Sequence, residues 1–158
     1  MLVPAILYKE EIIKNFKKYY YTDDLMYETG YIDNQYPEIA NTPDACTYQY
    51  AIVDDNEKLI GYLAYTIDWY GSGAYNFGLI SFDRGNPIIG KDLSNEMEKL
   101  IHEYKLHRIE WRLVSGNPVK KHYDKFCKKY NGNIIKLTDV FKDRHNEYHD
   151  TYIYEILL

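Results

Sequence analysis

The stretch from Gly85 to Asp92, GNPIIGKD, is close in residue types and spacing to a chemical motif. It differs by one residue from G-x-x-x-x-G-K-[ST], the loop in which main-chain amides and a lysine hold the phosphates of a nucleotide. Such loops also need a hydroxyl after the lysine, small residues inside the loop and an acidic metal ligand on a later strand. Here Asp92 replaces the hydroxyl, Pro87 lacks an amide hydrogen, and Ile88 and Ile89 are bulky. The motif therefore does not predict a nucleotide triphosphatase.

A more general anion site is still predicted at this position. An apolar run over 76–83 predicts a strand, Arg84 and Gly90 belong to the turn that follows, and an apolar stripe predicts a helix over 90–105. The first amides of a helix have no partner within the helix and attract anions. The junction of strand and helix is therefore a candidate phosphate site.

Asp92 could compete with an anion for the amides at this helix start. As an N-cap it would bind the amides that an anion would otherwise use, and its charge would repel the anion. Lys91 offsets that charge only locally. We therefore expect the helix to begin near Ile89 and Gly90, with Asp92 turned outward.

Asn117 and Tyr123 mark a second candidate site, at the start of the next helix. A strand predicted over 108–115 leads to Asn117 and Pro118, which are strong signals for a helix start. Tyr123 lies on the apolar stripe of the helix that follows, up to the NGN sequence. Capping alone explains Asn117, and packing in the core alone explains Tyr123, so both structural interpretations stay open beside a functional one.

The remaining elements follow from hydrophobic periodicity and turn residues. Helices are expected over 9–20, 90–105 and 118–130, and strands over 48–54, 59–68, 76–83, 108–115, 133–141 and 151–158. The strand–helix–strand unit implies a parallel pair, whereas the hairpins at either end imply antiparallel pairs. We expect an α/β fold in a single domain over 1–158: a mixed, mostly antiparallel central sheet, with helices on both faces and a central β-α-β-α-β unit.

Composition and charge exclude several classes of function. A net charge of −5 argues against general attraction to nucleic acid or to an anionic membrane. The N-terminal MLVPAILYKEE resembles neither a signal peptide nor a membrane span, and Cys46 and Cys127 have no disulfide or metal spacing. His145 and His149 lack an obvious third ligand, so no metal is expected. We expect a cytoplasmic protein.

The element order and the loop resemble the GCN5-related N-acetyltransferase family over about residues 48–158. DRGNPIIGKDL is similar to the family's pyrophosphate loop, [QR]-x-x-G-x-[GA], with Arg84 as the leading basic residue and Gly90 as the closing small residue. GNPVKKHYDKF is similar to the second signature, which implies that Asn117 contacts the pantetheine arm of CoA. The same signature implies that Tyr123 protonates the departing thiolate.

The resemblance implies direct transfer of an acetyl group from acetyl-CoA to an amine, in an opening between the third and fourth strands. The residues expected to bind the cofactor are Ile80, Phe82, Asp83, Arg84, Ile89, Gly90, Lys91 and Asn117. Tyr123 is the expected catalytic residue. The general base is open among Asp68, Asp83 and Glu110, and residues of 22–47 and the DWYGSG stretch are expected to shape the acceptor pocket.

Other interpretations remain open for the same residues. The lysines of the helix expected over 118–130 either bind the 3′-phosphate of CoA or form a solvated face: Lys120, Lys121, Lys125, Lys128 and Lys129. The loop from Arg84 to Gly90 is one residue longer than the family pattern, and Tyr123 is one residue closer to Asn117. These departures leave open a catalytically silent binding module of the same fold. A homodimer is a further expectation.

Overall fold

The structure, a computed structural model, describes residues 1–20, 22–23, 37–42 and 44–158. The strands are β1 (Leu2–Pro4), β2 (Thr47–Val53), β3 (Leu59–Asp68), β4 (Gly73–Ser81), β5 (Arg108–Val114), β6 (Asn133–Lys142) and β7 (Tyr148–Leu157). The helices are the short 3-10 helix η1 (Ala5–Tyr8), α1 (Lys9–Tyr19), α2 (Pro87–His102) and α3 (Lys120–Lys129). None of the described helices is long and apolar enough to span a membrane.

The strands form one seven-stranded sheet in the order β1-β2-β3-β4-β5-β7-β6. In the part of the chain that the structure describes, β4 and β5 are parallel and every other neighbouring pair is antiparallel. This arrangement confirms the mixed, mostly antiparallel sheet with a β4-α2-β5-α3-β6 unit.

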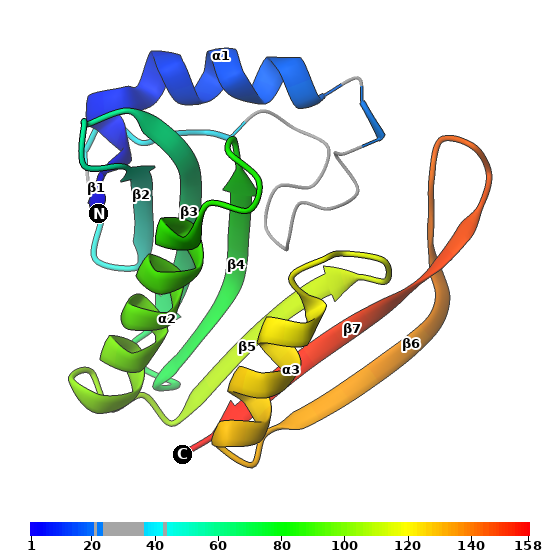
Figure 1. Ribbon diagram of the computed structural model, residues 1–158. Helices are drawn as coiled ribbons and strands as arrows, with labels where there is room; N and C mark the ends of the chain where they lie inside the picture. The colour runs from blue at the N-terminus through cyan, green and yellow to red at the C-terminus, as the bar shows by residue number, and fades with distance from the viewer. Residues whose placement is uncertain (21, 24–36, 43) are drawn as a thin grey trace.

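Helices cover both faces of the sheet, as predicted (Figure 1). On one face, Ile12 and Phe16 of α1 pack in a core that includes Ile80 of β4. On the other face, α2 and α3 share a larger core with the sheet, in which Leu93 packs with Leu79. Because consecutive side chains of a strand point to opposite faces, Leu79 faces α2 and Ile80 faces α1.

The parallel strands β4 and β5 separate soon after they pair. Within the described chain, only Gly73 with Arg108 and Ala74 with Ile109 are in register. Beyond them the two strands diverge, and Figure 1 shows the widening gap between their carboxyl ends. The separation of these two strands, expected from the family resemblance, is therefore present.

The predicted bounds of β4 were wrong at both ends. The strand begins at Gly73, not at 76, and it ends at Ser81. Asn76 has a φ of 56°, in the left-handed region, where the pairing with β3 is also irregular. Phe82 donates one last amide hydrogen bond to Ile60 O at 2.8 Å, and Asp83 already belongs to the turn before α2.

The predicted start of α2 and the position of Asp92 were also wrong. The helix begins at Pro87, because the Asn86 side chain caps it by accepting a hydrogen bond from Ile88 N at 3.0 Å. Asp92 is not turned outward: its side chain is only 14% exposed, and its Oδ2 lies 2.6 Å from the Met1 amine. A capping role for Asp92 is therefore excluded.

Smaller differences concern the ends of the chain and of other elements. β1 was not predicted, because its three residues are too few to show a period; it pairs Leu2 with Ile52. β7 begins at Tyr148 and not at 151, and α3 begins at Lys120 after a turn. α1 and β3 closely match the predicted 9–20 and 59–68.

Candidate functional site

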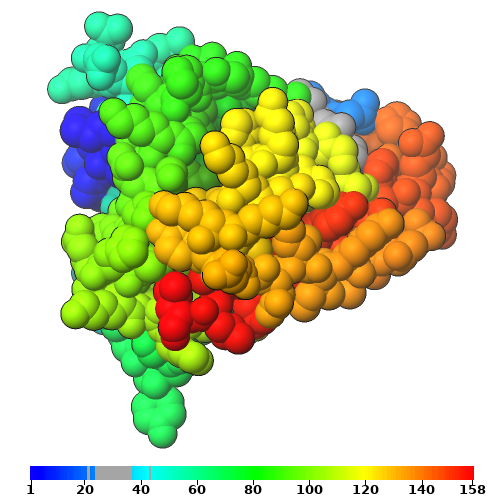
Figure 2. All heavy atoms as spheres, turned by 60° about the horizontal axis from the view of Figure 1, so that its bottom comes forward, coloured from blue at the N-terminus to red at the C-terminus, as the bar shows by residue number. Residues whose placement is uncertain are grey.

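A cleft of about 860 Å³ lies between α2, α3 and the carboxyl end of β4. Figure 2 shows the outer surface of this region, with α3 in gold beside the green and yellow-green residues of α2. The lining is largely apolar and also includes charged residues. The described lining includes Leu79, Ile80, Ser81, Arg84, Gly85, Asn86, Pro87, Ile89, Gly90, Lys91, Leu93, Met97, Glu98, Asn117, Val119, His122, Tyr123, Lys125, Phe126 and Lys129.

The same dipeptide, Asn-Pro, precedes both helices that border the cleft. Asn86 Oδ1 accepts a hydrogen bond from Ile88 N at 3.0 Å, and Asn117 Oδ1 accepts one from Val119 N at the same distance. Asn117 O also accepts from Lys120 N at 3.1 Å, which leads the chain into α3. Asn117 thus caps the turn that leads into α3 and not, as predicted, the helix itself, whose N-cap is Val119. Asn117 also borders the cleft, with only 6% of its surface exposed.

The end of the cleft at these helix starts is positively charged. Arg84, Lys91 and Lys125 are among its lining residues, and the positive ends of the two helix dipoles point to the same region. Toward the other end, Glu98 is neutralised by Lys129, whose Nζ lies 2.5 Å from Glu98 Oε1. An anionic group in the cleft is therefore favoured at the end where the helices begin, although the whole chain carries a charge of −5.

The first turn of α2 opens on free space at Gly90. A Cβ built there would meet no atom within 4 Å. However, few amides are available at this helix start, because Pro87 has no amide hydrogen and Asn86 occupies the amide of Ile88. Charge therefore contributes more than main-chain hydrogen bonds to any attraction of an anion here.

Tyr123 is packed and also borders the cleft. The residue is 5% exposed, and its ring lies edge-on to Trp111 and Tyr154, with centroid distances of 6.0 and 5.8 Å. Trp111 in turn stacks on Tyr154 at 5.2 Å. The aromatic contacts fix the orientation of the Tyr123 ring, and the residue still borders the cleft. Packing in the core and a catalytic role are therefore compatible.

The structure separates the lysines of α3 into different environments. Lys120 binds Asp124 at 2.9 Å and lies over the Tyr152 ring, and Lys129 binds Glu98. Lys125 lines the cleft, whereas the described lining contains neither Lys121 nor Lys128. Lys125 is therefore the lysine of this group best placed for a phosphate inside the cleft without giving up a described ion pair.

Two of the residues predicted to bind the cofactor lie away from the cleft. Phe82 packs in the α1 core, where its ring centroid is 6.0 Å from that of Tyr19. Asp83 Oδ2 accepts a hydrogen bond from Asn86 Nδ2 at 2.9 Å and so shapes the loop. The predicted residues that border the cleft are Ile80, Arg84, Ile89, Gly90, Lys91, Asn117 and Tyr123.

Sequence reasoning missed Ser81, the last residue of β4. The Phe82–Ile60 hydrogen bond and the register of Ile80 with Tyr62 direct the main-chain groups of Ile80 and Phe82 toward β3. Ser81 lies between these two residues, so its main-chain groups point in the opposite direction, toward the gap where β5 has separated from β4. Strand alternation predicts this phase once the end of β4 is known.

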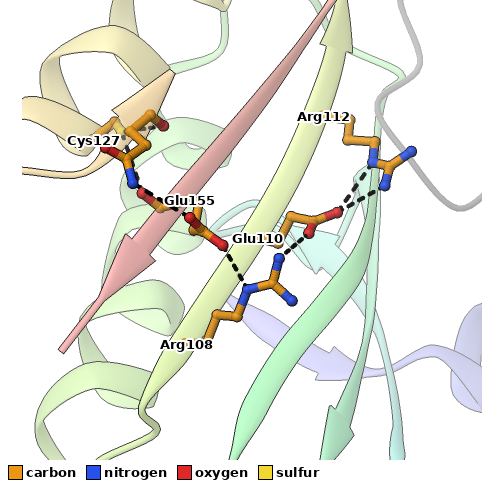
Figure 3. Close-up of polar contacts among 6 residues, drawn as sticks. Arg108, Glu110, Arg112, Cys127 and Glu155 are labelled. Carbon is orange, nitrogen blue, oxygen red and sulfur yellow. Dashed lines mark hydrogen bonds and ion pairs between the residues drawn. The ribbon is translucent and has the colours of Figure 1, made fainter. Parts of the chain in front are cut away.

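Neither Asp68 nor Glu110, both candidate general bases, lies in the cleft. Asp68 Oδ1 accepts hydrogen bonds from Tyr70 N and Gly71 N, in the turn at the opposite end of β4. That turn contains the DWYGSG stretch. Both oxygens of Glu110 are bound by guanidinium groups, from Arg108 at 2.7 Å and from Arg112 at 2.9 Å (Figure 3). These contacts give each of the two carboxylates a structural role.

The two histidines of the predicted i, i+4 pair have separate partners. His145 Nε2 lies 2.8 Å from Asp23 Oδ1, and His149 Nε2 lies 2.8 Å from Asp143 Oδ2. Asp143, Glu147 and His149 bring possible ligand atoms within 4.8 Å of one another. Asp143 also accepts the amides of His145 and Glu147, and its hydrogen bond with His149 lowers the pKa of the Asp143 carboxyl. The contacts of a tight turn thus account for this cluster.

The acceptor pocket expected in 22–47 falls mostly outside the described residues, since 21, 24–36 and 43 are not described. Of the described parts, 22–23, 37–42 and 44–47, the second contributes Ile39 to the α1 core. The expected contribution of this segment to an acceptor pocket stays a prediction.

No protein-family model matches the sequence, and no curated protein matches it. Among solved structures, a dodecameric spermidine N-acetyltransferase from Vibrio cholerae is similar, with a TM-score of 0.58 and 19% identity over 72% of this chain and 66% of that one.

Two further structures give the same result. A chimera of the Vibrio cholerae spermidine N-acetyltransferase SpeG and hSSAT has a TM-score of 0.55 and 19% identity, over 72% of this chain and 69% of the other. A probable acetyltransferase has a TM-score of 0.56 and 18% identity, over 72% and 63%. At this identity the likeness is one of fold. The chain has the fold of the GCN5-related N-acetyltransferase family.

Proposed function

We propose that this chain is a divergent member of that family and an acetyl-CoA-dependent N-acetyltransferase that moves an acetyl group directly to an amine. The observation that carries the proposal is the separation of β4 from β5 after two registered pairs, beside a cleft at the start of two helices. A parallel pair that stops early leaves main-chain groups of β4 available to a ligand. The resemblance to the family implies the same separation.

The residues present fit CoA in its charge and in its space. Arg84 and Lys91 provide positive charge where the diphosphate would lie, at the start of α2. Gly90 leaves room for close approach, and Lys125 on the facing rim suits the 3′-phosphate. The largely apolar walls between α2 and α3 suit the pantetheine arm.

Acetyl-CoA, when bound, supplies the activated thioester. The chain's own part is to align that group beside β4, to exclude water with the apolar walls, and to provide a proton for the departing sulfur. Tyr123 is the candidate proton donor, because it borders the cleft and its ring is held by Trp111 and Tyr154. The base that accepts the proton of the amine is not assigned to a residue.

Spermidine is the first amine to test, since two of the similar structures are spermidine N-acetyltransferases. The decisive experiment combines binding with turnover. Acetyl-CoA should raise the melting temperature of the protein in a concentration-dependent manner, and acetylated product should form with at least one amine of a panel that includes spermidine and peptide amines. Binding without turnover on the panel would favour a catalytically silent module, and the absence of any thermal shift at millimolar acetyl-CoA would refute the proposal.

A further inference from the structure

Ser81 has a side-chain hydroxyl that the fold does not use. The oxygen is shielded from solvent and has no hydrogen-bond partner among the described residues. A buried hydroxyl without a partner destabilises a folded protein, so such groups are rare and call for an explanation. Trp111 Nε1 is also buried without a described hydrogen-bond partner. However, Ser81 is among the described residues that line the cleft, and Trp111 is not.

The position of Ser81 relates this hydroxyl to the cleft. Leu79 faces the core under α2, Ile80 faces α1, and alternation returns the Ser81 side chain to the face of α2 and α3. Ser81 is also the last residue of β4, three positions before Arg84, and both border the cleft. Its hydroxyl therefore lies beside the positively charged end of the cleft, at the mouth of the gap between β4 and β5.

A small movement is enough to bring the hydroxyl into contact with a ligand. The Ser81 side chain turns about one bond among three staggered positions, and leaving the present position breaks no described hydrogen bond. A ligand that offers a donor or acceptor beside β4 would therefore gain a hydrogen bond at little cost to the protein.

We propose that Ser81 is a ligand-binding residue whose hydroxyl hydrogen-bonds the pantetheine arm of CoA, at the part of the arm next to the diphosphate. This inference rests on the proposed function, because it requires CoA in the cleft. The arm carries amide and hydroxyl groups that can pair with a serine, and the Ser81 main chain points to the same gap. A contact with the diphosphate itself is the competing arrangement, which ligand fragments can distinguish.

The test compares the wild-type protein with Ser81→Ala and with Ser72→Ala as a matched control. Ser72 precedes β4 at its opposite end, where its Oγ accepts a hydrogen bond from His107 N at 3.3 Å. Calorimetry would measure the binding of CoA, 4′-phosphopantetheine and adenosine 3′,5′-bisphosphate. Ser81→Ala should weaken the first two ligands about five- to tenfold and leave the bisphosphate unchanged, since only the first two contain the arm. Ser72→Ala should bind all three like the wild type.

Each other outcome has a defined meaning. Equal affinity of Ser81→Ala and wild type for CoA would overturn the inference, and so would an equal loss for all three ligands. If the wild-type protein binds none of them, the proposed function fails and the inference fails with it. The melting temperature of unliganded Ser81→Ala should be equal to or above that of the wild type, because the hydroxyl makes no described hydrogen bond; a marked decrease would show that Ser81 has a structural partner.

Discussion

The two edges of β5 differ sharply, although they belong to the same strand. On one edge, β7 is in register with all of Arg108–Val114. On the other edge, β4 is in register with two residues and then separates. Side chains reinforce the closed edge: Trp111 stacks on Tyr154, and Arg108 binds Glu155 at 2.8 Å (Figure 3).

The difference places the pairing and packing that stabilise this region on one edge of β5, and the separation from β4, beside the proposed ligand site, on the other edge. The closed edge is secured by main-chain hydrogen bonds and by aromatic packing, so the sheet continues without help from β4. The open edge faces β4, and Leu79, Ile80 and Ser81 at the carboxyl end of β4 line the cleft between α2 and α3. Substitutions on the two edges should therefore change different properties, which gives the following predictions.

The largest effect is expected from filling the cleft beside the separated end of β4. Gly90→Leu places a side chain in the free space at the first turn of α2, where no atom lies within 4 Å of a Cβ. Calorimetry should show a loss of CoA affinity of about 100-fold, without a loss of thermal stability, because leucine is a better helix former than glycine. Asn95→Leu, on the exposed side of the same helix, is the control. Normal CoA binding by Gly90→Leu would place the ligand elsewhere.

A loss of similar size but of a different kind is expected from Tyr123→Phe. Without the hydroxyl, kcat for acetyl transfer should fall about 100-fold, whereas CoA affinity and melting temperature should stay close to those of the wild type. Steady-state kinetics with calorimetry on the same preparation separates these quantities. Tyr70→Phe, in the exposed turn at the far end of β4, should have no effect. An unchanged kcat for Tyr123→Phe would assign the residue to packing alone.

A smaller effect is expected from Lys125→Ala. The affinity for CoA should fall about fivefold at low salt and the affinity for dephospho-CoA should not, because the ion pair with the 3′-phosphate is partly exposed and screened. Lys128→Ala is the matched control, since Lys128 is exposed and not part of the described lining. An equal loss of affinity for CoA and dephospho-CoA in both lysine variants would show that the overall positive charge of α3, and not a specific phosphate site, attracts the ligand.

The smallest effect is expected at the closed edge, from Asp124→Asn. Partial burial raises the pKa of the Asp124 carboxyl, but hydrogen bonds from Lys120 and from Tyr154 at 2.7 Å outweigh it, so the pKa is lowered. A lowered pKa stabilises the fold above the unfolded-state value, and this stabilisation is lost as the pH falls through the folded-state value.

The variant should lose about 1 kcal/mol at neutral pH and less as the medium becomes acidic. Urea unfolding at several pH values measures this, with Asp55→Asn in the exposed β2–β3 turn as the control. CoA affinity should not change. A variant that is as stable as the wild type at neutral pH would show that the hydrogen bonds of Asp124 contribute nothing net.

The hydrophobic pattern predicted most elements and the sheet type, because the apolar residues of α2 and β5 repeat with clear periods and β3 is a continuous apolar run. It failed at β4, where Asn76 interrupts the alternation, and at β1, which is too short to show one. The start of α2 could have been predicted: Asn86-Pro87 is the same signal that was recognised at Asn117-Pro118.

The candidate site was predicted in part, for a physical reason. A loop pattern identifies residues next to a cleft, such as Arg84 and Gly90, but not the phase of the strand before it. A shift of one position along a strand reverses the edge to which the main-chain groups point. The prediction named Ile80 and Phe82, whose main-chain groups point to β3, and omitted Ser81, whose main-chain groups point to the gap. The separation of the α3 lysines depends on partners from distant elements, Glu98 and Tyr152, which no local pattern contains.

The central claim is that the cleft between α2, α3 and the separated end of β4 is a CoA site. Titration of the wild-type protein and of Gly90→Leu with CoA in a calorimeter tests it most directly. We predict saturable binding of one CoA per chain for the wild type and a loss of about 100-fold for the variant. No measurable heat with the wild type at millimolar CoA, or equal binding by both proteins, would contradict the claim.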